Sequence, residues 1–272
     1  MKHLSKSLFI TAFPTWALLL ALYSIGNFSL QKLGILLSSM TVIVFFAGLY
    51  LKPRARTSAF LLPYTLLIGT GLAIALFYLD TYAVLLTSSL VVLWWAYLSW
   101  YSYLPAVKDS KLQLHQQLPK LEFETSDGKK ISTDELPGDF KILMFYRGNW
   151  CPLCVAQIKE VAAHYRELQE MNTTVLLISP QPSQHHSNLH KKFNVPFYYV
   201  KDVKNRVARA LGIVHLQGIP FGFQLLGYDS DTVFPTVIIT DKEGNIIHIE
   251  QTDNYRVRPE PSAYISIIKH YN

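Results

Sequence analysis

Two cysteines, Cys151 and Cys154, are the only thiols in this chain of 272 residues, and both lie in the segment FYRGNWCPLC. An apolar run ends at Tyr146, and apolar residues with helical spacing follow the cysteines. We therefore expect Cys151 where a strand ends and a helix begins, with Pro152 at the first helical position, which suits proline. A helix start favours an anion, so an exposed Cys151 thiol should have a lowered pKa.

Cys154 follows one helical turn later on the same face, which allows the pair to close a disulfide. Arg147 should favour a thiolate there, and Trp150 directly precedes the pair. These residues predict a redox-active centre that cycles between dithiol and disulfide. Inert core cysteines or half of a zinc site explain the spacing less well, because no second CxxC or CxxH pair completes four ligands. We expect neither a metal nor a cofactor.

Two other segments are candidates for function. His185, His186 and His190 have a spacing that fits metal ligands, but an exposed polar helix face explains them better. The loop 212–231 is long and rich in aromatic residues. The sequence leaves three roles open for it: a cover over the active-site groove, a packing insertion, or a surface that rests on a membrane.

The second half of the chain alternates strands and helices, which predicts an α/β fold with a central mixed sheet flanked by helices. Asp127-Gly128 indicates a hairpin turn. By periodicity, strands are expected at 121–125, near 131, and at 141–146, 174–179, 197–200, 236–240 and 246–251. Helices are expected at 152–170, 184–193, 203–211 and 261–270.

The first half is far more apolar than the second. Half of all residues are hydrophobic and only 16% are charged, compared with about 25% in ordinary domains. Its apolar runs predict four transmembrane helices of about 20 residues, at 7–25, 33–51, 57–79 and 82–104. We thus predict an all-α membrane region at 1–104, a linker at 105–118 and a redox domain at 119–272.

Basic residues give the expected orientation of the four spans. With four spans, the N-terminus, the second loop and the redox domain share one side, and Lys52, Arg54 and Arg56 lie in that loop. The positive-inside rule therefore places both termini and the redox domain in the cytoplasm, at an inner or plasma membrane. This bias accounts for the net charge of +6, so no nucleic acid is expected as a partner. Without ionisable groups in the spans, we expect an inert anchor.

The segment FYRGNWCPLCVAQIKEV resembles the active-site segment of the peroxiredoxin-like (alkyl hydroperoxide reductase / thiol-specific antioxidant, AhpC/TSA) branch of the thioredoxin-fold superfamily. FPTVIITDKEGNIIHIEQTDNYRVRPEP resembles the C-terminal strand pair and tail of the same branch. The resemblance implies a thioredoxin-like fold, in which Pro235 matches the cis-proline that faces the CxxC. Arg256, in the tail, is expected either to reach the active site or to form a surface salt bridge.

The sequence departs from the PxxxTxxC pattern of typical peroxiredoxins. Counted back from Cys154, Cys151 stands at the threonine place and Arg147 at the proline place. The TxxC alignment favours Cys154 as the cysteine that meets peroxide, whereas the logic of thioredoxins makes Cys151 the attacking thiol and Cys154 the resolving one. We expect Cys151 to be the nucleophile because it occupies the helix start.

These patterns predict a membrane-anchored thiol-disulfide oxidoreductase. Its partners would be the lipid bilayer, an external thiol donor of the thioredoxin or glutathione type, and a protein disulfide or hydroperoxide substrate. One alternative is a thiol-dependent peroxidase with antioxidant activity. A second is a thioredoxin-fold module that binds without catalysing a reaction.

Overall fold

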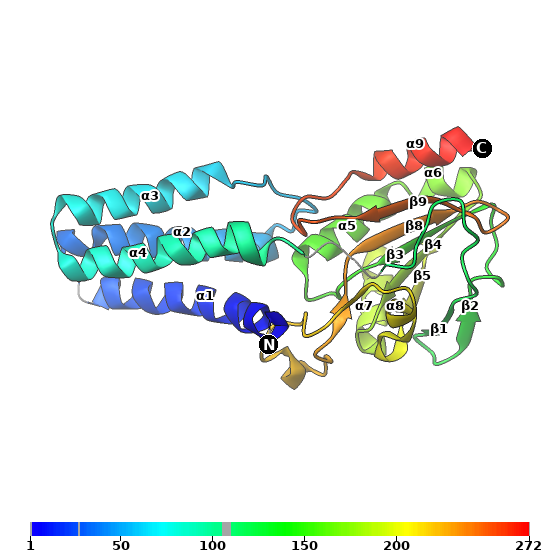
Figure 1. Ribbon diagram of the computed structural model, residues 1–272, viewed down its shortest axis with the longest axis horizontal. Coiled ribbons are helices and arrows are strands. Elements are labelled where there is room, and N and C mark those ends of the chain that lie inside the picture. The colour runs from blue at the N-terminus through cyan, green and yellow to red at the C-terminus, as the bar shows by residue number, and fades with distance from the viewer. Residues whose placement is uncertain (1, 27, 105–109, 272) are drawn as a thin grey trace.

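The computed structural model describes residues 2–26, 28–104 and 110–271. Figure 1 shows two parts along the long axis, a bundle of helices and an α/β domain. The N-terminus lies where the two parts meet, and the C-terminus lies in the α/β domain. This arrangement confirms the predicted fold class, an α-helical region followed by a mixed sheet with flanking helices.

The bundle contains α1 (Lys2–Gly26), α2 (Leu33–Leu51), α3 (Leu62–Phe77) and α4 (Thr81–Ala96), and α4 continues as a π-helical turn, Tyr97–Tyr101. Three of these helices are long and apolar enough to cross a membrane: 5–26, 30–51 and 81–101. The third expected span, 57–79, is helical only over Leu62–Phe77 and is shorter than the others. Residues 105–109 of the predicted linker lie outside the described residues.

Helices α2 and α3 approach each other at two glycines. A Cβ atom on Gly71 would lie 2.0 Å from Ser38 Oγ and 2.6 Å from the carbonyl oxygen of Gly34. Small residues permit such contacts between helix backbones, and the dispersion energy of close packing is what holds apolar helices together in lipid. The two glycines therefore fix the distance between α2 and α3.

We expect Gly71→Ala to lower the free energy of unfolding of the detergent-solubilised protein by about 1–3 kcal/mol, because the new methyl group must push the backbones apart. Gly69→Ala is the matched control, since a Cβ there meets nothing within 4 Å. Thermal unfolding of both variants measures the difference. Equal stability of the two variants would contradict the packing argument.

The α/β domain is built on one seven-stranded sheet, with strand order β2-β1-β5-β4-β3-β8-β9. Strands β3, β4 and β5 are parallel to one another, and the remaining pairs are antiparallel. The strands are β1 (Glu122–Thr125), β2 (Lys130–Ser132), β3 (Phe140–Phe145), β4 (Thr173–Ser179), β5 (Tyr198–Lys201), β8 (Thr236–Thr240) and β9 (Ile246–Gln251). A small second sheet pairs β6 (Val214–His215) with β7 (Thr232–Val233).

Alternate residues of the central strands face two apolar cores. Ile142 and Leu177 face a core that includes residues of α5 (Pro152–Ala163), α7 (Ser183–Phe193) and α9 (Pro261–Tyr271). Leu143 and Leu176 face the other core, with residues of α8 (Arg206–Ala210). The short helix α6 (Tyr165–Glu170) follows α5 after a break at His164, where we expected one continuous helix. The first core also contains residues of the helix bundle, so the two parts share one apolar interior.

The two parts are joined through a segment that follows β9. The Tyr97 and Tyr255 hydroxyls lie 2.9 Å apart. The backbone N–H of Thr57 donates to the Arg256 carbonyl at 2.8 Å, and Arg56 forms a 2.5 Å ion pair with Glu160 of α5. These contacts hold the loop between α2 and α3 against the α/β domain, the part of the chain predicted to be the redox domain.

Candidate active site

The two cysteines lie at the start of α5, directly beyond the end of β3. Cys151 is the N-cap residue of α5 and Pro152 opens the helix, the position that the sequence predicts. The backbone N–H of Cys151 donates to the Gly148 carbonyl at 3.2 Å, which closes the turn between strand and helix. Gly148 adopts φ +137, a backbone conformation that residues with a Cβ rarely adopt.

Both thiols are buried and reduced, so our expectation of an exposed Cys151 is wrong. Cys151 is 2% exposed and Cys154 is 0% exposed. The hydrogen bond between the sulfurs, together with burial, raises the pKa of Cys151 well above its ordinary value. Burial also acts to raise the pKa of Cys154, but the hydrogen bond from Cys151 and the charge of Arg258 outweigh it and lower the pKa to about 5. The two shifts favour a single negative charge on the pair, and the contact with Arg258 favours Cys154 as its location.

Arg258 provides the positive charge beside that thiolate. Its Nη2 lies 3.6 Å from Cys154 Sγ and its Nη1 donates to Gln157 Oε1 at 2.7 Å. Its Nε donates to the Tyr255 carbonyl at 2.9 Å. Arg258 is itself 4% exposed, so solvent does little to screen its interaction with the sulfur. Two hydrogen bonds to protein oxygens thus hold the guanidinium in place beside the Cys154 sulfur.

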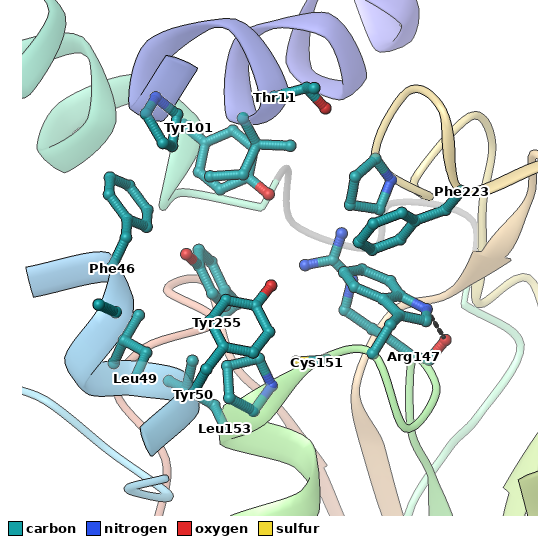
Figure 2. A pocket seen from close by; sticks show the side chains of 16 residues that line it. Thr11, Phe46, Leu49, Tyr50, Tyr101, Arg147, Cys151, Leu153, Phe223 and Tyr255 are labelled. Carbon is teal, nitrogen blue, oxygen red and sulfur yellow. Dashed lines mark hydrogen bonds between the residues drawn. The ribbon is translucent and has the colours of Figure 1, made fainter. Parts of the chain in front are cut away.

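Cys151 also lines a pocket of about 320 Å³ between the helix bundle and the redox domain (Figure 2). Arg147 and Trp150 border this pocket, and the Arg147 guanidinium lies 4.7 Å from the centre of the Trp150 ring. The Trp150 Nε1 donates to the Arg147 carbonyl at 3.1 Å. Cys154 is not among the pocket-lining residues, so only one of the two cysteines borders the pocket.

Arg256 and Pro235, two residues of the family-like C-terminal segment, differ from expectation. The guanidinium of Arg256 donates to Ser102, to Thr57 and to the carbonyls of Ser58 and Ala59, at 2.7 to 3.1 Å. It therefore anchors the redox domain to the bundle, and it neither contacts the thiols nor forms a surface salt bridge. The described residues contain no cis peptide bond, so the Phe234-Pro235 bond is trans, contrary to the implied cis-proline.

Of the three histidines, His190 is exposed as expected, His185 is half-buried and His186 departs from the expected exposed face. His186 is fully buried, with its ring nitrogens 3.4 Å from the Tyr146 and Ser179 hydroxyls, and burial lowers its pKa to about 4. His185 stacks on the ring of Tyr228 at 5.1 Å. Within the described ranges, no three metal-ligating side chains form a cluster.

The loop 212–231 lies against both the pocket and α1. Pro220 and Phe223 line the pocket, and the backbone N–H of Phe221 donates to the Ser7 carbonyl at 3.1 Å. Of the three roles left open by the sequence, the structure supports a cover over the active-site groove.

Arg258 is the functional residue that sequence reasoning missed. It stands two positions after Arg256 in the segment RVRPE, which has no regular secondary structure. Successive residues of an extended segment point to opposite sides, so two residues that are two positions apart are expected on the same side. In the structure Arg256 contacts the bundle and Arg258 contacts Cys154, so the spacing gives no sign that only one of the two arginines reaches the cysteines.

Comparisons with known proteins match the part of the chain that contains the two cysteines. The sequence profile of the AhpC/TSA family matches residues 114–249, which include both cysteines. The chain is 24% identical over 136 residues to Peroxiredoxin Bcp of Bacillus subtilis, an alignment that covers 50% of this chain and 83% of the relative. It is 27% identical over 135 residues to a Putative peroxiredoxin bcp of Coxiella burnetii, covering 50% and 85%.

Among solved structures, Peroxidoxin BcpB from Mycobacterium tuberculosis superposes with a TM-score of 0.49 and 14% identity, covering 59% of this chain and 99% of that one. The matched residues of the family profile make up half of the chain and contain the whole strand-to-helix turn with its two thiols. This chain belongs to the AhpC/TSA family.

Proposed function

We propose that this protein is a membrane-anchored, thiol-dependent peroxidase. The observation that carries the proposal is the contact at 3.6 Å between Arg258 Nη2 and the sulfur of buried Cys154, beside a second thiol at Cys151. Against the effect of burial, the hydrogen bond from Cys151 and the charge of Arg258 lower the pKa of Cys154 and favour its thiolate. Membership of the AhpC/TSA family supports an enzyme with thiol peroxidase and antioxidant activity. The curated relatives are named peroxiredoxins, and they support this alternative better than disulfide exchange, the function that the sequence first suggested.

In the first step, the Cys154 thiolate attacks one oxygen of a hydroperoxide and the O–O bond breaks. Cys154 becomes a sulfenic acid, and the other oxygen leaves as an alkoxide, or as hydroxide when the substrate is hydrogen peroxide. Because Cys151 lies between the pocket and Cys154, the peroxide reaches the thiolate when the Cys151 side chain rotates away. The leaving oxygen then takes the Cys151 proton and departs as an alcohol or as water.

In the second step, the Cys151 thiolate attacks the sulfenic sulfur of Cys154. A disulfide forms, and the hydroxide that leaves takes one proton from solvent to become water. The two thiols have then supplied two electrons and the peroxide has been reduced. An external thiol of the thioredoxin or glutathione type returns the pair to the dithiol by disulfide exchange.

Disulfide exchange with a protein substrate ranks second. The names of the curated relatives, which are peroxiredoxins, support peroxide reduction ahead of it. A non-catalytic module is the third candidate. Full-length reduced protein should consume hydrogen peroxide with loss of both thiols. If both thiols survive peroxide, their reaction with a protein disulfide would support the second candidate, and no reaction with either would support the third.

The membrane location is part of the proposal. Three apolar helices of sufficient length support an integral membrane protein. Lys52, Arg54 and Arg56 lie in the loop between α2 and α3, and Arg56 pairs with Glu160 of α5. Basic residues on the side of the redox domain support a cytoplasmic redox domain with both termini on the same side.

The pH dependence of the first step follows from the Cys154 pKa. Because the pKa is lowered to about 5, the thiolate should persist from neutral pH down to about pH 6 and disappear as the pH falls through about 5. Single-turnover oxidation by hydrogen peroxide should follow the same curve. A profile that rises up to about pH 8.5, the range of an ordinary thiol, would contradict this assignment.

A further inference from the structure

The pocket that Cys151 borders is walled on one side by the helix bundle. Its lining residues come from α1, α2, the turn after α4, the redox domain and the loop 212–231 (Figure 2). Examples are Ile10, Pro14, Phe46, Tyr101, Leu153 and Phe223. Most of these side chains are apolar or aromatic, so the walls favour a largely apolar ligand.

The pocket has an outer end on the bundle. Three of the lining residues are exposed, namely Thr11 of α1 and Ala47 and Tyr50 of α2. Ala47 and Tyr50 lie near the C-terminal end of α2, and Thr11 lies in the N-terminal half of α1. These parts of the two helices face the α/β domain, where a membrane interface would be, and tyrosine is typical of that depth. The outer end of the pocket is therefore at the depth at which an acyl chain of the bilayer would meet the bundle.

The inner end of the pocket is polar. Arg147 is 3% exposed, and its Nη2 donates to the Gly218 carbonyl at 2.6 Å. Its Nε, also buried, has no hydrogen-bond partner among the protein atoms described. Figure 2 shows the guanidinium pointing into the space between Tyr101 and Phe223, on the side of Cys151. A buried donor of this kind favours a ligand that brings an oxygen acceptor.

We infer that the membrane helices form half of the substrate site, and that the substrate is a hydroperoxide carried on a long acyl chain in the bilayer. The chain lies between α1 and α2, and the hydroperoxide oxygens lie between Arg147 and the sulfurs. This inference rests on the proposed peroxidase function. Arg147 donates to the oxygen that leaves as an alkoxide, before that oxygen takes the Cys151 proton. The helices thus select the substrate, in contrast to the inert anchor that the sequence suggested.

The test uses full-length protein in phosphatidylcholine vesicles and follows a single oxidation of the dithiol. One arm adds phosphatidylcholine hydroperoxide to the vesicles, and the other adds tert-butyl hydroperoxide to the water. At equal concentration per sample, we expect the lipid substrate to oxidise the pair at least tenfold faster. Equal rates, or a faster reaction with tert-butyl hydroperoxide, would overturn the inference while leaving the peroxidase function intact. Failure of both peroxides, and of hydrogen peroxide, would instead overturn the peroxidase function.

Ala47→Trp narrows the pocket from α2. We expect this variant to lower the ratio of lipid to tert-butyl hydroperoxide rates at least tenfold. Ala12→Trp is the matched control, because Ala12 is an exposed residue of α1 that does not line the pocket, and its ratio should stay at the wild-type value. An unchanged ratio in Ala47→Trp would contradict the assignment of the pocket. Because the wild-type comparison stands by itself, the inference is tested even if Ala47→Trp does not fold.

Discussion

Replacing Cys154 by serine is expected to reduce the rate of peroxide reduction by on the order of 10³-fold or more, because the variant loses the nucleophile itself. Serine is close to cysteine in size, so the apolar surroundings of the site should survive the substitution. Stopped-flow oxidation by hydrogen peroxide, with mass spectrometry of the product, measures the effect. No sulfenic acid should form in this variant.

Cys151→Ser is the matched control, and it should behave in the opposite way. The thiolate and Arg258 remain, so one equivalent of peroxide should be consumed and a sulfenic acid should persist on Cys154, where dimedone can trap it. Turnover should stop there, because no second thiol is present to form the disulfide. If Cys154→Ser kept the rapid first step and Cys151→Ser lost it, Cys151 would be the nucleophile.

Arg258→Gln is expected to raise the pKa of Cys154. Burial opposes a charge on this sulfur, and the guanidinium is the positive group in contact with it. If the pKa returns to about 8.5, the thiolate fraction at pH 7 falls to about 3%, and the first step slows by about 30-fold. The pH at which the rate reaches half of its plateau should rise by the same shift.

Arg256→Gln separates this effect from a loss of structure. Arg256 is buried like Arg258 and lies two positions away, but it donates to the bundle rather than to a sulfur. We expect it to lower thermal stability and to leave the pH midpoint of the first step unchanged. A shift of the midpoint in Arg256→Gln, or its absence in Arg258→Gln, would show that the charge of Arg258 does not control the thiolate.

The sequence predicts the sheet well because strand patterns are local. The expected strands 236–240 and 246–251 agree with β8 and β9. The DKEGN turn between them marks the end of the first strand and the start of the second. The helix start at Cys151 follows equally from Pro152 and from the apolar run before it. The expected third span is too long at its start, because residues 57–59 bond to Arg256 in the redox domain rather than continuing the helix.

The electrostatics of the site depend on contacts between distant segments, which no local pattern contains. A helix start alone predicts a lowered pKa for Cys151, but the bundle packs over that thiol and removes it from water. The charge then lies on Cys154, because Arg258 reaches it from a segment about a hundred positions away. Spacing within the cysteine motif could not reveal either contact.

The segment 254–258 contacts both the helix bundle and the cysteine pair. Arg256 holds the loop between α2 and α3, while Arg258, two residues later, holds the thiolate. Cutting the chain after α4 to obtain a water-soluble fragment would remove the Arg256 acceptors at Thr57, Ser58 and Ala59 and strip the pocket of its α1 and α2 walls. The substrate pocket of such a fragment would differ from that of the intact chain. Screens for inhibitors or reductants should therefore use the whole protein in lipid.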